Sequence, residues 1–242
     1  MKSLLVFDFD HTIVDGNSDT WVVRCTPEKK LPDWLRKTYD GKHWNEYMQR
    51  VLAYIGDQGI KESEMKQVMQ SMPIIPGMVD LLKFICQSKD QVDCIIISDS
   101  NTIFINWILE VINSTLAFDS ILTNPATFDE ESHLTIKNFH FHNCPQCPDN
   151  LCKKKALADF VADQLKIGVQ YKKTIYTGDG GNDLCPIKGL KKCDIAMVRK
   201  GYKLEKLIHE MVDGNSGSIQ PSIMIWSSGE EILSYLKRCL KI

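Results

Sequence analysis

Short runs of apolar residues alternate along this chain with longer segments whose apolar residues recur at helical spacing. The runs have the length and composition of strands buried on both faces, and they lie at residues 4–7, 92–97, 121–123, 174–177, 194–197 and 223–226. Amphipathic helical patterns separate several of them, at 78–88, 102–112 and 152–165. Buried strands separated by helices predict an α/β fold, a doubly wound (Rossmann-like) parallel sheet with right-handed crossovers.

The segment 15–72 interrupts this alternation with a helical pattern of its own. Between residues 45 and 55 the apolar positions follow one helix face, and Ser63 is a candidate N-cap for a second helix. The tryptophans and tyrosines of this segment are predicted to be core residues rather than residues that stack on a substrate. A Pro-Ile-Ile-Pro-Gly stretch at 73–77 then returns the chain to the first pattern. Two parts are therefore expected: a core of residues 1–14 and 73–242, and a helical insertion of residues 15–72.

The composition narrows the class of protein. Of 242 residues, 43% are hydrophobic and 25% charged, which is ordinary for a globular protein. A net charge of −2 gives no electrostatic footprint for nucleic acid or an anionic membrane surface, and no run approaches the roughly 20 apolar residues of a membrane span. The nine cysteines include Cys86, Cys94 and Cys239 within apolar periodic segments, where reduced core thiols occur. We therefore expect a cytoplasmic protein, with no nucleic acid, membrane or protein partner implied.

Polar clusters stand at the carboxyl ends of three predicted strands. Asp8 and Asp10 follow the first apolar run, and Asp179 and Asp183 follow the run at 174–177. Carboxyl ends of parallel strands meet at one edge of an open α/β sheet, which is where such sheets bind ligands. Two carboxylates one residue apart repel each other, and a bound cation usually compensates this repulsion. A third cluster and a lysine run complete the set: Ser98-Asp99 and Lys153-Lys154-Lys155.

In chain order these residues form D-x-D-x-T at 8–12, a strand-terminal serine, a lysine, and G-D-x-x-x-D at 178–183. From Leu4 to about Met197 the set resembles the motifs of the haloacid dehalogenase-like phosphatase superfamily. The insertion after Asp15 matches the position of that superfamily's first cap domain. Three further stretches resemble the PHOSPHO-type phosphatases: residues 17–21, 97–101 and 199–202. Along its whole length, including residues 17–21 and 152–154, the chain resembles the pyridoxal phosphate phosphatase branch more closely than the phosphoethanolamine/phosphocholine branch.

This resemblance implies a Mg²⁺-dependent phosphoric monoester hydrolase that acts on a small phosphorylated metabolite through an aspartyl phosphate. It implies pyridoxal 5′-phosphate as the substrate, with phosphoethanolamine or phosphocholine as the alternative. A folded protein substrate is disfavoured, because a helical cap would close over the site and exclude it. The alternative from another class is a non-catalytic phosphometabolite- or zinc-binding module, which would have no need of a nucleophile.

The resemblance also implies roles for the four acidic residues. Asp8 is the expected nucleophile, and Asp10 is the expected general acid and base, which protonates the leaving alcohol and later deprotonates water. The Mg²⁺ ion would be bound by the carboxylates of Asp8 and Asp179 and by the backbone carbonyl of Asp10, because Mg²⁺ prefers oxygen ligands. Asp183 completes this metal set and is expected to orient a metal-bound water rather than to bind directly.

Further residues are expected to contact the substrate. Ser98 would donate to a phosphate oxygen, and one lysine would supply a fixed positive charge. The resemblance implies Lys153 for that role, because the lysine of the superfamily lies about four residues before the first large apolar side chain of its helix, here Leu157, and Lys154 is the alternative. Asp19 and Asp99 match positions that meet the leaving group, where two carboxylates favour a cationic or hydrogen-bond-donating alcohol. In the alternative interpretation both acids are solvated, and Asp99 caps the following helix.

Residues 124–150 show no periodicity and are predicted to be irregular. With one residue beyond them they contain donors at zinc-site spacing: His140, His142, Cys144, Cys147 and Cys152. The second C-x₂-C pair of a zinc ribbon is missing from the sequence. A reduced loop beside the site is therefore an equal alternative to one structural Zn²⁺, and a redox pair is the third interpretation.

Overall fold

A six-stranded sheet forms the centre of the structure, a computed structural model that describes residues 1–213 and 219–240. All five strand pairings are parallel, in the order β3-β2-β1-β6-β7-β8. The predicted doubly wound sheet is therefore confirmed. The strand order reverses between β1 and β6, which makes the carboxyl ends of these two strands the expected ligand-binding edge. The strands are β1 Lys2–Phe7, β2 Val92–Asn101, β3 Ser120–Asn124, β6 Tyr171–Gly178, β7 Ile195–Arg199 and β8 Ser222–Trp226.

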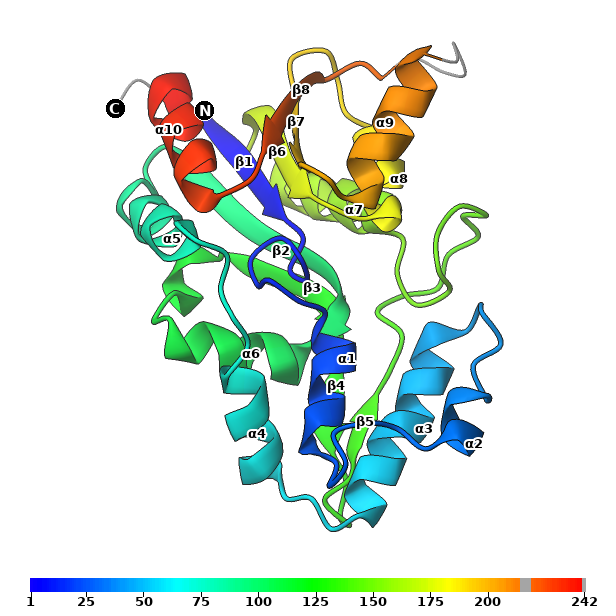
Figure 1. Cartoon of the computed structure of the whole chain (residues 1–242). Coiled ribbons are helices and arrows are strands. Elements are labelled where there is room, and N and C mark those ends of the chain that lie inside the picture. Colours follow the sequence, from blue (N-terminus) through cyan, green and yellow to red (C-terminus); the bar gives the residue numbers. More distant parts are fainter. Residues whose placement is uncertain (214–218, 241–242) are drawn as a thin grey trace.

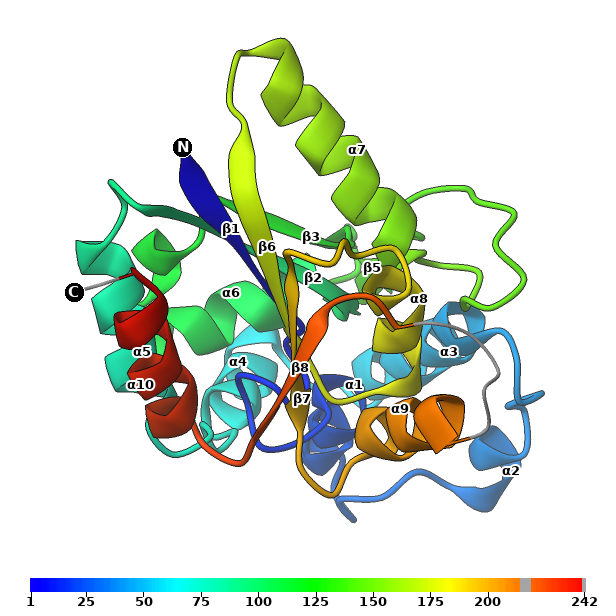
Figure 2. The ribbon, with the colours of Figure 1, turned by 90° about the horizontal axis from the view of Figure 1, so that it is seen from above.

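Helices cover both faces of this sheet (Figure 2). On one face lie α5 (Met78–Gln87), α6 (Thr102–Val111) and α10 (Gly229–Leu240), and on the other α7 (Lys153–Lys166), α8 (Leu184–Ile187) and α9 (Lys203–Asp213). Alternate residues of β1 contribute to the two separate apolar clusters, because successive side chains of a strand point to opposite faces. A short 3₁₀ helix, η2, spans Thr115–Ala117. No helix in the described part of the chain is long and apolar enough to cross a membrane.

Residues 15–72 form a group of helices beyond the carboxyl ends of the central strands (Figure 1). Helix α4 begins at Glu62, not after Ser63 as predicted. The Glu64 carboxylate accepts a hydrogen bond from the backbone N–H of Lys61 (2.9 Å), so the side chain that closes this helix start lies inside the first turn. The elements are α1 Ser18–Trp21, the 3₁₀ helix η1 Val22–Cys25, α2 Asp33–Arg36, α3 Trp44–Asp57 and α4 Glu62–Gln70.

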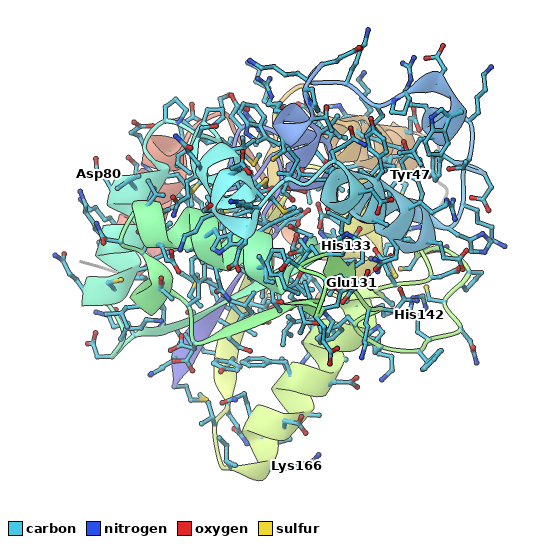
Figure 3. The ribbon with its side chains drawn as sticks, turned by 90° about the horizontal axis from the view of Figure 1, so that it is seen from below. Tyr47, Asp80, Glu131, His133, His142 and Lys166 are labelled. Carbon is cyan, nitrogen blue, oxygen red and sulfur yellow. The ribbon has the colours of Figure 1, made fainter. Side chains whose placement is uncertain are left out.

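An antiparallel hairpin of β4 (Ala126–Phe128) and β5 (Leu134–Ile136) packs against α3, so the prediction that 124–150 is irregular was wrong for this part. The backbone N–H of Ile136 donates to the Gln49 side chain (2.8 Å). At the hairpin turn, His133 lies beside the end of α3, with its Nε2 3.8 Å from the Asp57 carboxylate (Figure 3). Strands of three residues are too short to show a period of two, which is why the sequence pattern did not indicate them.

Candidate active site

The strand ends of β1 and β6 bring acidic side chains together. Asp8 follows β1, and its backbone N–H donates to the carbonyl of Thr177 in β6 (2.9 Å). Asp179 follows β6 directly, and η3 (Gly181–Asp183) begins two residues later. Carboxylate oxygens of Asp8, Asp179 and Asp183 lie within 4.8 Å of one another, and all three side chains are buried. The neighbouring parallel strands thus place these groups, far apart in the sequence, at one edge.

Lys153 is the cation of this cluster. It is the first residue of α7, it is 1% exposed, and its Nζ lies 2.6 Å from Asp8 Oδ2 and 2.8 Å from Asp183 Oδ1. Lys154 is exposed. Burial alone would lower the pKa of Lys153, but the negative charges of Asp183 and Asp8 outweigh it and raise that pKa, so the ammonium group stays charged. Of the two candidate lysines, the structure brings Lys153 to the site.

Asp183 has little capacity left for a further ligand. Its Oδ1 accepts from Lys153 Nζ (2.8 Å) and the Tyr176 hydroxyl (2.6 Å). Its Oδ2 accepts from the backbone N–H groups of Asp179 (3.1 Å) and Gly180 (3.0 Å). A carboxylate has about four lone-pair positions, and four donors already occupy them. The geometry therefore suits a residue that holds Lys153 and the loop at Asp179 in place.

Negative charge exceeds positive charge in this buried cluster. Three carboxylates face one ammonium group, which leaves two charges uncompensated when all are ionised. Burial raises the pKa of Asp8 well above its usual range, with the charge of Asp183 adding to the effect. Burial and Asp183 likewise raise the pKa of Asp179 to about 7. A buried set of hard oxygen donors with an excess of negative charge fits a divalent cation such as Mg²⁺.

Asp10 lies beside this cluster and is held by the first helix of the insertion. Its Oδ1 accepts from the backbone N–H of Ser18 and its Oδ2 from the Ser18 hydroxyl, both at 3.0 Å. The same hydroxyl lies 2.7 Å from that of Ser100, at the end of β2. Burial and the charge of Asp19 raise the pKa of Asp10 to about 8. This raised pKa favours the protonated form of Asp10, which is the state that a general acid needs.

A cavity of about 560 Å³ lies above these groups, within the size range of small-molecule sites. One wall comes from the insertion, and it includes Asn17, Asp19, Tyr39, Lys42 and Trp44. The indole N–H of Trp44 donates to Asp19 Oδ2 (2.6 Å). The expectation that the aromatic residues of the insertion are core residues was therefore wrong for Tyr39, which is exposed, whereas Trp44 both packs against the core and lines the cavity. Trp44 opens the amphipathic helix α3, so its type and spacing alone do not separate a cavity wall from a core position.

Ser98 and Asp99 form another part of the lining. They lie within β2, which continues to Asn101 and so runs beyond the predicted apolar run. Asp99 Oδ2 accepts from the Asn182 side chain (2.6 Å), whereas Oδ1 is buried and has no hydrogen-bond partner among residues 1–213 and 219–240. Asn101 caps α6 by accepting from two backbone N–H groups, so Asp99 is not the cap. Burial raises the pKa of Asp99.

A family model described as "Putative Phosphatase" matches residues 3–240, nearly the whole chain. The chain belongs to this phosphatase family. It is 54% identical over 241 residues to "Pyridoxal phosphate phosphatase PHOSPHO2" of Bos taurus, with 100% of both chains covered. It is 39% identical over 240 residues to "Phosphoethanolamine/phosphocholine phosphatase" of Gallus gallus, which covers 99% of this chain and 90% of that protein.

Solved structures support the fold. The structure "Phospho-Aspartyl Intermediate Analogue of Phosphoserine phosphatase" superposes with a TM-score of 0.61 at 16% identity, covering 97% of this chain and 98% of the other. At that identity the likeness shows the fold alone, and it agrees with the haloacid dehalogenase type that the sequence predicted. Membership of the family makes the chain a phosphatase, a phosphoric monoester hydrolase.

In this phosphatase, Arg199 holds the loop that follows Asp8 and Asp10. Its Nη1 donates to the carbonyl of His11 (2.7 Å), its Nη2 to Asp15 (2.8 Å), and its guanidinium lies 4.3 Å from the ring centre of Tyr202. Sequence reasoning assigned Arg199 no role. The signals that could have found it were the resemblance of residues 199–202 to the PHOSPHO-type phosphatases and its position at the end of β7, a neighbour of β6 in the sheet.

The cysteine loop differs from the arrangement expected. Four sulfur atoms lie within 4.8 Å of one another, those of Cys144, Cys147, Cys152 and Cys185. The structure places His140 and His142 outside this group: His140 Nε2 accepts from the backbone N–H of Cys152 (3.0 Å), and His142 Nδ1 accepts from that of Cys144 (3.2 Å). Cys185 was not predicted, because it lies in α8, far along the chain from the loop. Only the fold brings it there.

Proposed function

We propose that this phosphatase hydrolyses pyridoxal 5′-phosphate through an aspartyl phosphate on Asp8. The observation that carries the proposal is the buried Asp8 carboxylate at the base of the cavity, 2.6 Å from the Lys153 ammonium group. The ammonium group keeps positive charge next to the nucleophile, where the negatively charged phosphoryl group must approach. Full-length identity of 54% to a pyridoxal phosphate phosphatase, against 39% to a phosphoethanolamine/phosphocholine phosphatase, supports the substrate.

Two displacements at phosphorus account for the reaction. In the first, an Asp8 carboxylate oxygen forms a bond to phosphorus while the bond from phosphorus to the alcohol oxygen breaks, and Asp10 gives its proton to that oxygen. In the second, a water oxygen attacks the phosphorus, Asp10 takes the water proton, and the bond to Asp8 breaks. Inorganic phosphate leaves, and both aspartates return to their starting states. Ser98 and Lys153 donate to phosphoryl oxygens in both steps.

The acidic cluster would hold one Mg²⁺ ion. Its ligands would be the carboxylates of Asp8 and Asp179 and the backbone carbonyl of Asp10, while Asp183, whose oxygens already have four donors, would contact it through water. When bound, the ion supplies positive charge between the Asp8 carboxylate and the phosphoryl group.

The helical insertion, residues 15–72, acts as a cap over the phosphate site and contributes to substrate choice. Asp99 Oδ1, which has no hydrogen-bond partner within the described part of the chain, can accept from the pyridine nitrogen or the hydroxyl group of pyridoxal phosphate. A quaternary ammonium group, as in phosphocholine, has no N–H to give. Trp44 and Tyr39 offer flat faces on which a pyridine ring can stack, and Asp19 adds negative charge beside them.

The thiols support a reducing compartment for this enzyme. All nine cysteines of the chain are free in the structure, and four of them are close enough together to be oxidised readily. We infer a reducing compartment, the cytoplasm, where the partner of the enzyme is its small phosphorylated substrate.

The test is steady-state turnover with Mg²⁺ on pyridoxal phosphate, phosphoethanolamine and phosphocholine. Pyridoxal phosphate is expected to have the highest kcat/KM. A higher kcat/KM for phosphoethanolamine would show that phosphoethanolamine is the preferred substrate instead. Asp8→Asn, which changes the volume little, is expected to remain folded without measurable turnover. The matched control is Asp80→Asn, on the exposed side of α5 and remote from the site (Figure 3). Near-normal turnover by Asp8→Asn would reject the covalent mechanism.

A further inference from the structure

We propose that Cys144, Cys147, Cys152 and Cys185 bind one structural Zn²⁺ ion, at a site separate from the magnesium site. The four sulfur atoms lie within 4.8 Å of one another, and Cys144 Sγ lies 3.7 Å from Cys185 Sγ. In a tetrahedral zinc–thiolate site with Zn–S bonds of about 2.3 Å, neighbouring sulfur atoms are about 3.8 Å apart. Four cysteines without an open position for water make a structural site rather than a catalytic one.

The four ligand cysteines come from two separate segments of the chain. Cys144, Cys147 and Cys152 belong to the loop that precedes α7, and Cys185 belongs to α8. Between residues 137 and 152 the structure has neither helix nor strand, so few backbone hydrogen bonds fix this segment. The sulfur ligands come together only in the folded chain, so the free energy of metal binding there would stabilise the folded loop.

Two histidines orient the ligand cysteines instead of binding the ion. His142 Nδ1 accepts the backbone N–H of Cys144, which places the ring proton on Nε2, and Nε2 donates to the carbonyl of Pro148 (2.9 Å). His140 Nε2 likewise accepts a hydrogen bond from the backbone N–H of Cys152. Such contacts around a metal site hold its ligands in a fixed orientation. His142 lies on the loop itself, as Figure 3 shows.

The site also lies next to the catalytic groups along the chain. Cys152 directly precedes Lys153, and Cys185 follows Asp183 by two residues. The ion would therefore tie together the two segments whose side chains form the ion pair between Lys153 and Asp183. Free thiols provide no comparable connection, since S–H groups are weak hydrogen-bond donors.

Elemental analysis of the purified wild-type chain tests the proposal. After growth with zinc and dialysis against a weak chelator, about one zinc per chain is expected. Cys185→Ser and Cys147→Ser should lose most of that zinc and melt at lower temperature. Cys193→Ser, at an exposed cysteine outside the group, should keep both the zinc and the melting temperature. Asp179→Asn should also keep its zinc, which separates this site from the magnesium site.

A second measurement covers the case in which the cysteine variants do not fold. The wild-type chain is stripped of metal and titrated with Co²⁺, and the visible absorption of a tetrahedral cobalt–thiolate complex should saturate at one equivalent. X-ray absorption of the zinc form should show four sulfur neighbours at about 2.3 Å and no nitrogen. A zinc-free protein that shows no cobalt bands would overturn the proposal, and so would a native disulfide between Cys144 and Cys147. None of these results depends on which phosphate ester is hydrolysed.

Discussion

Replacing Lys153 by methionine removes the only cation that contacts the acidic cluster among the described residues. The methionine side chain fills similar space, so the main loss is the charge. Asp8 and Asp183, 4% and 0% exposed, then stay buried without the ammonium group that lies 2.6 Å and 2.8 Å from their oxygens. Removing one partner of a buried ion pair costs about 3–5 kcal/mol, because the remaining charge is uncompensated. In a chain of this size the melting temperature should fall by roughly 6–20 °C.

The stability lost in Lys153→Met is expected to grow as the pH rises. The pKa of Asp8 is already raised in the folded state by burial and by Asp183, and without Lys153 it rises further. A carboxyl group with a raised folded-state pKa binds its proton more tightly in the folded chain, so stability falls as pH rises above the unfolded-state value of about 4. The loss in Lys153→Met should therefore be larger at about pH 8 than at about pH 5, and added Mg²⁺ should recover part of it.

Urea unfolding without Mg²⁺ measures the stability, and steady-state kinetics measure the reaction. We expect kcat of Lys153→Met to fall by about 10²–10³, the usual effect of removing one group that stabilises transition-state charge. Lys154→Met is the matched control: the neighbouring lysine is exposed, so its loss should change stability by no more than about 0.5 kcal/mol. Equal effects of the two substitutions, or wild-type stability of Lys153→Met, would refute the reasoning.

Three further predictions concern the acidic residues. Mg²⁺ should raise the melting temperature more at about pH 8 than at about pH 6, because protons on Asp8 and Asp179 compete with the ion. The pKa of Asp179 is raised to about 7, so this competition weakens between the two pH values, and equal shifts would contradict the prediction. Asp10→Asn should lower the single-turnover rate of alcohol release from pyridoxal phosphate by about 10²–10⁴ and that from p-nitrophenyl phosphate much less, since a nitrophenolate leaves without a proton. Equal losses in this first step would exclude Asp10 as the acid, whereas its loss as the base slows the second step for both substrates. Asp19→Asn and Asp99→Asn should each raise KM for pyridoxal phosphate by about 10–150-fold, as expected for one lost charge-assisted contact, and leave KM for p-nitrophenyl phosphate nearly unchanged.

The strands were predictable because most of them are buried on both faces. In β1, Leu4 and Val6 pack into the cluster with α7 to α9, and Leu5 and Phe7 pack into the cluster with α5 and α6, so the run is apolar without interruption. The positions of the acids were predictable for a related reason. In a parallel sheet the residues that follow neighbouring strands lie at one edge, whatever separates them in the sequence.

Other features depended on contacts that no local pattern records. The hairpin of β4 and β5 is stabilised by α3, through contacts such as that of Ile136 with Gln49. Cys185 lies next to the loop cysteines only because α8 packs on the start of α7. Asn182 is a spacer within the G-D-x-x-x-D motif, yet its side chain holds Asp99. Each of these residues has an ordinary type and spacing in the sequence, and its role arises from a partner far along the chain.

Asp183 shows how motif and fold combine at this site. The motif supplies a carboxylate at a fixed distance from Asp179, but the four donors that occupy it come from β6, the following turn and α7. A Cβ atom added at Gly178 would lie 2.4 Å from the Asp183 carboxylate, so the glycine is required for this close approach. With its oxygens occupied, Asp183 fixes the loop and shares the ammonium group of Lys153 with Asp8, so one positive charge faces three carboxylates. The cluster therefore keeps an excess of negative charge that a cation can balance beside Asp8, the proposed nucleophile.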